Sequence, residues 1–350
     1  MRTESQQFFR RLLEAPGPSG DERAAARVWR EYAAGFADVG TDALGSSHAV
    51  VNPSGEQTVV VMGHIDEIGL AITHVDDDGY LWFSGVGGWT PSVLVGQRIR
   101  ILAKGGPVVG VIGKKARHLE EEDERQKAVK LDQLWIDIGA TSGDDARVAV
   151  RAGDLAVVEQ PVVELRNGRL ASRAVDNRAG AFVAAEAARL YAEAPGSWRL
   201  IAVASVSEET SFAGAYTSAF GLDPQAAIAL DVTHTSDHPS VSKNKLGDVR
   251  MGAGPVIERG SGVHPALAEH VAETAAAEEI PHQFGASAGS TWTDADAVHR
   301  SRAGVATALV SVPNRYMHSP NEVVELADLE AAARLVAAAA RRLNAVPSSE

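Results

Sequence analysis

Four short runs of apolar residues stand out along the chain, and each run passes directly into polar residues. Because they are apolar at nearly every position, they indicate buried strands of a sheet that is covered on both faces. The four predicted strands are Thr58–Met62, Leu200–Val206, Ala226–Leu230 and Val305–Val312. Helical patterns separate them, at Glu4–Leu13, Asp21–Phe36, Ala174–Ala194, Gly214–Phe220, Pro265–Glu279 and Ala327–Leu343. Strands that alternate with helices predict an α/β fold.

The central part of the chain, from about Leu70 to Glu164, has a different pattern. Short alternating segments are separated there by turns rich in glycine and aspartate, such as Asp78-Gly79 and Gly105-Gly106-Pro107. The predicted strands of this part are Leu81–Ser84, Arg98–Ala103, Val108–Ile112 and Ala156–Val158. Closely spaced short strands indicate a small β-barrel or sandwich, inserted here into the α/β chain.

The composition narrows the range of functions. A chain of 350 residues can form one large domain or two moderate ones, and its net charge of -13 argues against nucleic acid or an anionic membrane as the main partner. The absence of cysteine excludes disulfides and thiolate metal sites. No apolar run is long enough to cross a bilayer, and Met1–Glu14 lacks the apolar core of a secretory signal. We therefore expect a cytoplasmic protein.

Candidate metal ligands follow the predicted strands. Histidine and carboxylate side chains follow the four strand ends, and one further carboxylate lies at a junction between a loop and a helix. These residues are His64, Asp66, Glu208, Glu209, Asp231 and His318 after the strands, and Asp176 at the junction. Parallel strands would bring their carboxyl ends to one edge of the sheet. Without cysteine, such a set suits zinc, cobalt or manganese, and two such ions about 3.5–4 Å apart form a hydrolytic centre.

Counting charges supports two ions. Two divalent cations carry four positive charges. The carboxylates of Asp176, Glu209 and Asp231 neutralise three of them and a bridging hydroxide the fourth, with His64 and His318 neutral. This assignment is an expectation from residue type alone.

Two carboxylates have other expected roles. Glu208 stays outside the set of ligands, where it is free to move protons, and Asp66 holds the imidazole of His64 in a fixed orientation. Each candidate also has a structural explanation, such as a helix cap for Asp176 or a loop histidine for His318. Jointly these explanations are weaker, because buried unpaired carboxylates are costly and metal ions remove that cost.

The motifs that carry these residues resemble those of the M42 family of metallo-aminopeptidases, of the glutamyl or leucyl aminopeptidase-like, tetrahedral type. The resemblance follows the family's order over nearly the whole chain. The matching stretches are Glu14–Gly20, Gly63–Gly69, Gly87–Gln97, Ala174–Gly180, Glu208–Glu209, Asp231–His234, Thr293–Ala295 and Arg315–Pro320.

The resemblance implies a role for each candidate. One metal ion would be held by His64, Asp176 and Asp231, and the second by Asp176, Glu209 and His318, so that Asp176 bridges the two. Glu208 would be the general base. Zinc is the first expectation for both ions, with cobalt or manganese as alternatives. The implied reaction is hydrolysis of the N-terminal residue from peptides that have a free N-terminus.

The resemblance also implies an architecture. Residues 1–66 and 169–350 would form a discontinuous catalytic domain, a three-layer α/β/α fold of the phosphorylase/hydrolase type with a mixed sheet. Residues 67–168 would form an inserted small β-barrel domain that mediates dimerisation or larger assembly. The expected partners are peptide substrates and further copies of the chain, from a dimer to a dodecamer, with no nucleic acid and no membrane.

Two departures from the family pattern and two other functions remain open at this point. Asn177 stands where the family has an aspartate, and Ser211 where it has a glycine. The same metal centre would serve a deacylase, an amidohydrolase or a carboxypeptidase. A catalytically silent assembly protein with structural metal ions is the alternative from another class, although such a protein has no need of Glu208 as a base.

Overall fold

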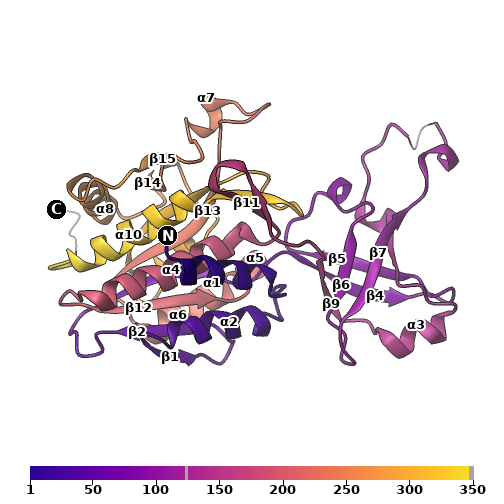
Figure 1. The fold of residues 1–350 in the computed structure, drawn as a ribbon, viewed down its shortest axis with the longest axis horizontal. Helices are drawn as coiled ribbons and strands as arrows, with labels where there is room; N and C mark the ends of the chain where they lie inside the picture. The colour runs from indigo at the N-terminus through magenta and orange to yellow at the C-terminus, as the bar shows by residue number, and fades with distance from the viewer. Residues whose placement is uncertain (123–124, 347–350) are drawn as a thin grey trace.

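The computed structural model describes residues 1–122 and 125–346, and it places a large mixed sheet beside a smaller barrel (Figure 1). Within these residues the sheet has eight strands in the order β1-β2-β12-β3-β13-β16-β14-β15. The strands are β1 (Asp38–Thr41), β2 (Ser47–Val51), β3 (Thr58–His64), β12 (Arg199–Ser205), β13 (Ala226–His234), β14 (Val256–Gly260), β15 (Gln283–Ser287) and β16 (Ala306–Asn314). Some neighbouring strands of this sheet are parallel and others are antiparallel, which confirms the mixed sheet.

The four strands predicted from the apolar runs form the centre of the sheet. β12, β3, β13 and β16 lie side by side in that order, and every neighbouring pair is parallel. Their carboxyl ends therefore meet at one edge. β13 and β16 extend beyond the apolar runs, because they continue to pair as far as His234 and Asn314. Asp231 consequently lies inside β13, opposite Ser311, rather than after its end.

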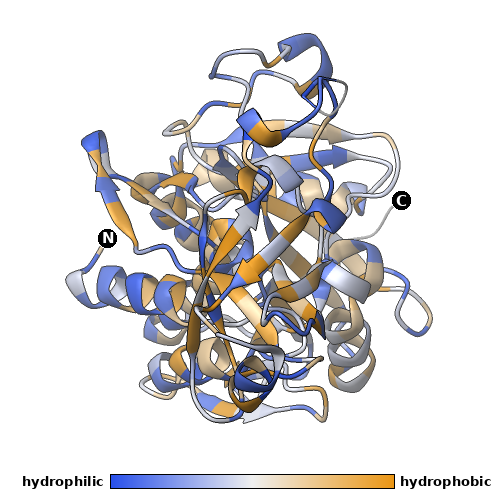
Figure 2. Ribbon diagram, turned by 90° about the vertical axis from the view of Figure 1, so that its right-hand side faces the viewer, coloured by the Kyte–Doolittle hydropathy of each residue, from blue (hydrophilic) through white to orange (hydrophobic). Residues whose placement is uncertain are grey.

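Successive residues of the central strands face opposite layers of helices. In β3, Val59 and Val61 belong to the core on one face, whereas Val60 and Met62 belong to the core on the other. The first layer contains α1 (Thr3–Glu14), α2 (Arg23–Ala33), α4 (Val175–Glu193), α8 (Pro265–Ala277) and α10 (Leu326–Arg341), and the second contains α6 (Ala213–Leu222) and α9 (Ala295–Val298). Figure 2, viewed from the side of the barrel, shows hydrophobic positions on the strands at its centre and hydrophilic positions on the outer helices and loops. The three-layer α/β/α arrangement is confirmed.

Six antiparallel strands close the barrel in the order β4-β5-β8-β7-β6-β9. They are β4 (Gly69–Val75), β5 (Leu81–Val86), β6 (Arg98–Ile101), β7 (Val108–Lys114), β8 (Leu134–Asp137) and β9 (Leu155–Val158). The sequence left a barrel and a sandwich open, and the closed ring of strands decides for the barrel. Its core is separate from that of the large sheet: Ile112 of β7 points into it, whereas Val109 and Val111 are exposed.

The remaining elements are a small third sheet and several short helices. A small antiparallel sheet contains β10 (Val163–Leu165), β11 (Arg169–Ser172) and β17 (Glu322–Glu325). The short helices are α3 (Gly143–Ala149), α5 (Glu208–Ser211) and α7 (Lys243–Leu246), with 3-10 turns at Pro91–Val93, Arg117–Leu119, Leu131–Gln133 and Arg166–Gly168. Throughout the described ranges, every helix is too short or too polar to cross a membrane.

Strand β3 and helix α4 approach each other closely just before His64. A Cβ atom on Gly63 would lie 2.4 Å from the carbonyl carbon of Gly180 and 2.7 Å from the nitrogen of Ala181. Both neighbours are backbone atoms, so a side chain at position 63 would force the strand and the helix apart. Glycine at this position therefore fixes how closely the strand that ends in His64 packs on α4.

We expect Gly63→Ala to lower the free energy of unfolding by about 1–3 kcal/mol, because the packed backbone must separate to admit the methyl group. Urea denaturation of the purified variant measures this change. Gly105→Ala is the matched control, since its Cβ would meet nothing within 4 Å among the described residues, and its effect should stay within about 0.5 kcal/mol. Equal stability of the two variants would contradict the close packing.

Candidate metal centre

The expected ligands come together at the edge where the central strands end. Six side chains from five separate segments converge there: His64 at the end of β3, Asp231 in β13, Glu208 and Glu209 at the start of α5, His318 after β16, and Asp176 near the start of α4. Three groups of them have ligand atoms within 4.8 Å of one another. Short connections from parallel strands thus place groups that are distant in the sequence around one small volume.

Asp176 lies between the two imidazoles. Its Oδ1 is 3.2 Å from Nε2 of His64, and its Oδ2 is 3.4 Å from Nε2 of His318. Asp231 approaches the first imidazole, with Oδ1 4.0 Å from Nε2 of His64, and Glu209 approaches the second, with Oε2 3.4 Å from Nε2 of His318. One carboxylate that faces a different histidine with each oxygen has the geometry of a group shared between two cation sites.

Glu208 also lies close to the first imidazole. Its Oε2 is 3.6 Å from Nε2 of His64, and it forms a third group of neighbouring ligand atoms with His64 and Glu209. Burial raises the pKa of Glu208 to about 10, and the charge of Asp231 adds to this rise, although His64 opposes it. Positive charge, such as that of bound divalent cations, would counteract this rise, and the carboxylate could then accept a proton and return it, as a general base in hydrolysis must.

The histidines and carboxylates perturb each other strongly. Burial would lower the pKa of His64, but its carboxylate neighbours, Glu208 first, raise it well above its usual value. Hydrogen bonding to Asp176 and Glu209 raises the pKa of His318 to about 11. Burial would raise the pKa of Asp176, yet the two imidazoles lower it. Such mutual shifts are typical of functional sites.

The donor set fits divalent cations. The four carboxylates and His64 are nearly buried, and within the described part of the chain Oε1 of Glu209 has no hydrogen-bond partner. A buried carboxylate oxygen without a partner is costly unless a cation or proton compensates it. Imidazole nitrogen and carboxylate oxygen are ligands of zinc, cobalt and manganese.

Asp66 lies behind the first imidazole, as the sequence predicts. Its Oδ1 is 3.3 Å from Nδ1 of His64, on the side of the ring away from the other carboxylates. The same carboxylate accepts the backbone N–H groups of Glu208 (3.1 Å) and Glu209 (3.2 Å) and the hydroxyl of Ser19 (2.5 Å). Asp66 therefore contacts the histidine and the glutamate turn together, and only the first of these contacts was expected.

Two buried carboxylates beside the centre were not predicted. Glu322 accepts the backbone N–H groups of Asp176 and His318, each at 2.8 Å. Glu22 accepts the N–H (3.2 Å) and the hydroxyl (3.3 Å) of Ser207, the residue before α5. The sequence offers little signal for either: Glu322 follows a histidine-serine-proline motif, and an acidic residue near a helix start such as Glu22 ordinarily needs no other role.

The matching stretch Thr293–Ala295 contributes a further buried carboxylate. Asp294 accepts the hydroxyl of Ser205 at the end of β12, and burial raises its pKa to about 6. Its other oxygen, Oδ1, lacks a partner among the residues that the structure describes. Asp294, which lies in the second helix layer, therefore supports β12, the strand that leads to the glutamate turn.

The two departures from the expected motif have local explanations. The amide of Asn177 donates to the carbonyl of Leu230 (2.8 Å) and accepts the N–H of Gly180 (2.8 Å). An aspartate could make only the second of these bonds, so asparagine suits this position. Ser211 ends α5 and donates its hydroxyl to the carbonyl of Ser207 at 3.3 Å. Neither departure disturbs the six converging side chains.

The barrel reaches the centre through a pair of glycines after β5. A Cβ on Gly87, which has φ +74°, would lie 2.5 Å from Ile68 and 3.4 Å from Oε2 of Glu209. A Cβ on Gly88 would lie 3.2 Å from Nδ1 of His318. The backbone of this turn therefore forms a wall of the centre, close against two of its side chains.

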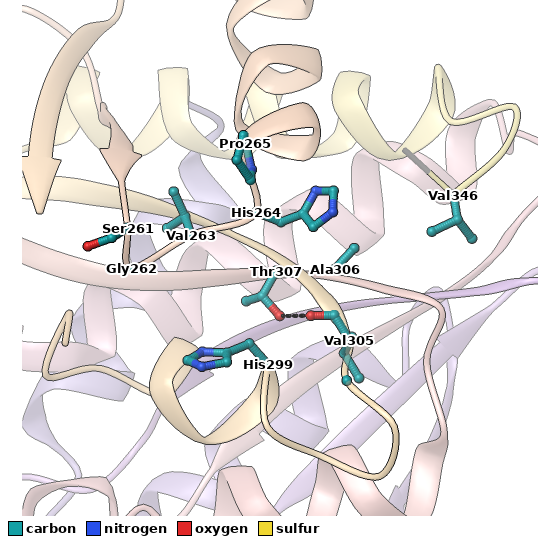
Figure 3. Close-up of a pocket in the computed structure, with 11 residues that line it drawn as sticks. Ser261, Gly262, Val263, His264, Pro265, His299, Val305, Ala306, Thr307 and Val346 are labelled. Carbon is teal, nitrogen blue, oxygen red and sulfur yellow. Dashed lines mark hydrogen bonds between the residues drawn. The ribbon is translucent and has the colours of Figure 1, made fainter. Parts of the chain in front are cut away.

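A separate cavity of about 430 Å³ lies at the opposite end of β16, where the strand begins (Figure 3). Val305, Ala306 and Thr307 line it together with two histidines. His264 accepts the N–H of Leu267 at the start of α8, and the imidazole Nδ1 of His299 lies 3.0 Å from the carbonyl of Ala295. These histidines support helix ends, and the cavity is not part of the candidate metal centre.

Comparisons with known proteins give a consistent result. Residues 45–335 match the M42 glutamyl aminopeptidase family. A lysyl aminopeptidase of Pyrococcus furiosus is 34% identical over 347 residues, which are 97% of each chain. The crystal structure of a TET aminopeptidase from the marine sediment archaeon Thaumarchaeota archaeon SCGC AB-539-E09 has a TM-score of 0.93 and 34% identity, covering 97% of this chain and 96% of that one.

A second solved structure concerns assembly. The TET1 peptidase of Pyrococcus horikoshii, which can assemble into a tetrahedron or a large octahedral shell, has a TM-score of 0.86 and 31% identity, covering 97% of this chain and all of that one. The family match, at residues 45–335, includes all six side chains of the centre. The resemblance found in the sequence is thereby confirmed, and the chain belongs to the M42 family of aminopeptidases.

Proposed function

We propose that this aminopeptidase uses two divalent metal ions, held at the candidate centre, to remove N-terminal residues from peptides. The observation that carries the proposal is the position of Asp176, because its two oxygens face Nε2 of His64 and Nε2 of His318. In this assignment His64, Asp176 and Asp231 hold one ion, and Asp176, Glu209 and His318 hold the other. Zinc is the first candidate, with cobalt and manganese as alternatives.

Each group of the chain then has a task in hydrolysis. Divalent cations at such a centre act as Lewis acids that polarise the scissile carbonyl and lower the pKa of water. Glu208 takes the proton of the attacking water on its carboxylate and returns it to the leaving amine. Asp66 keeps Nδ1 of His64 oriented and holds the turn that carries Glu208.

We further propose that residues 67–168 form a dimerisation domain inserted into a catalytic domain of residues 1–66 and 169–350. Two features support this division. The barrel has a hydrophobic core of its own, and its strand β7 exposes Val109 and Val111 on the outer surface, 58% and 46% accessible. The similar TET1 peptidase of Pyrococcus horikoshii can assemble into a tetrahedron or a large octahedral shell.

The metal requirement and the substrate class can be tested together. We expect hydrolysis of aminoacyl-p-nitroanilides to stop after removal of metal by a chelator and to return when zinc, cobalt or manganese is added, because the cations supply the Lewis acid. N-acetylated aminoacyl-p-nitroanilides serve as the control and should stay uncleaved. Release of acetate from the acetylated compounds, with no p-nitroaniline released from the free-amine compounds, would point instead to a deacylase of the same broad group.

The role of Glu208 predicts a variant that keeps its metal but loses turnover. Glu208→Gln should lower kcat about 10²- to 10⁴-fold, because the amide cannot accept the proton of water. Zinc content by atomic absorption should remain at the wild-type value. Glu209→Gln provides the comparison, since it replaces a proposed carboxylate ligand with a neutral amide and should lower zinc content. Near wild-type turnover of Glu208→Gln would overturn the assignment of the base.

The proposed barrel contact predicts a change in assembly. Val109→Lys combined with Val111→Lys should decrease the molar mass measured by light scattering after size exclusion, because two charges would be desolvated in the contact. Val39→Lys, on the exposed strand β1 of the large sheet, is the control and should leave the mass unchanged. An unaltered mass in the double variant would refute the assignment of this face.

A further inference from the structure

Glu322 is a buried carboxylate that no step of the proposed reaction uses. Its side chain is 2% exposed and lies between two proposed ligands. Oε2 accepts the backbone N–H of Asp176, and Oε1 accepts the backbone N–H of His318, both at 2.8 Å. The carboxylate of Glu322 therefore links the backbones of Asp176 and His318, two proposed ligands of the same metal ion.

The strand that carries Glu322 is itself fixed to both of these segments. Glu322 begins β17 and pairs with Ser172 of β11, the strand that leads to Asp176. The next residue, Val323, exchanges two backbone hydrogen bonds with Arg315, at 3.0 and 3.1 Å, just before the turn that carries His318. The carboxylate is thus held by backbone pairing at a fixed distance from each ligand segment.

The turn that carries His318 needs such support. His318 and Tyr316 both have φ in the left-handed region, at 59° and 63°, where residues with a side chain are uncommon. Backbone of this kind persists when the surroundings over-determine it, and residues of this kind cluster at functional sites. The hydrogen bond from the N–H of His318 to Glu322 provides one such constraint.

We propose that Glu322 is a positioning residue that sets the spacing between Asp176 and His318 and thereby the affinity of the second metal ion. The inference rests on the proposed dinuclear centre. The first ion depends less on Glu322, because His64 and Asp231 lie in neighbouring strands whose spacing is fixed by the sheet. Loss of Glu322 should therefore weaken one ion selectively.

Two substitutions separate position from charge. Glu322→Asp keeps the negative charge but is one methylene shorter, so it cannot reach both N–H groups. Glu322→Gln keeps the length, but its amide has one acceptor oxygen and turns its own donor toward the other N–H. A positioning role predicts that both variants weaken the second ion. A purely electrostatic role predicts that only Glu322→Gln does so.

The test is titration of the chelated full-length protein with zinc in isothermal calorimetry, with a competing chelator to reach tight affinities. The wild type should bind two ions. In both Glu322 variants the second ion should bind about 10- to 100-fold more weakly, as found when groups that orient ligands are removed, with the first ion changed much less. Glu325→Gln, on the same strand and bonded to Arg169, is the matched control and should bind both ions normally.

A second readout avoids emptying the protein, in case a variant folds poorly without metal. Zinc release from the loaded enzyme into excess chelator should show one faster-released ion in both variants, and excess zinc should restore kcat to near the wild-type value. Unchanged affinity and release in both variants, or normal behaviour of Glu322→Asp alone, would overturn the positioning role. Fewer than two ions in the wild type would instead overturn the dinuclear centre and this inference with it.

Discussion

The centre depends on a buried carboxylate that is not itself one of its ligands. Asp66 accepts hydrogen bonds from the N-terminal loop at Ser19 and from the backbone of Glu208 and Glu209, and it faces Nδ1 of His64. These segments belong to three distant parts of the chain. A single side chain therefore fixes the imidazole and the glutamate turn relative to each other, in addition to the pairing of β3 with β12.

Backbone N–H groups donate hydrogen bonds to several buried carboxyl groups at this edge. Asp66 and Glu322 each accept two of them, and Oδ1 of Asp231 accepts the N–H of Val232 at 2.8 Å. Hydrogen bonds to an ionised group are stronger than neutral ones, and burial of a carboxylate without them would cost several kcal/mol. The strained turns at the ends of the strands thus have a second use, because they direct their N–H groups inward.

The sequence predicted the large elements and the converging side chains, because both follow from local pattern. Fully apolar runs identify strands that are buried on both faces, and each such run passed into a ligand-type residue. The supporting residues carry no comparable signal. Glu322 and Glu22 look like any acidic residue at a strand or helix start, and their partners, such as His318 and Ser207, are known only once the chain is folded. Barrel closure depended likewise on pairing between distant strands, and short alternating segments are compatible with more than one arrangement.

The glycine turn of the barrel has a consequence for the shape of the centre. A side chain at Gly87 would press on Ile68, and one at Gly88 would press on the ring of His318, so backbone rather than side chains forms this wall. The position of this wall follows the position of the barrel, which links the geometry of the centre to whatever holds the barrel in place.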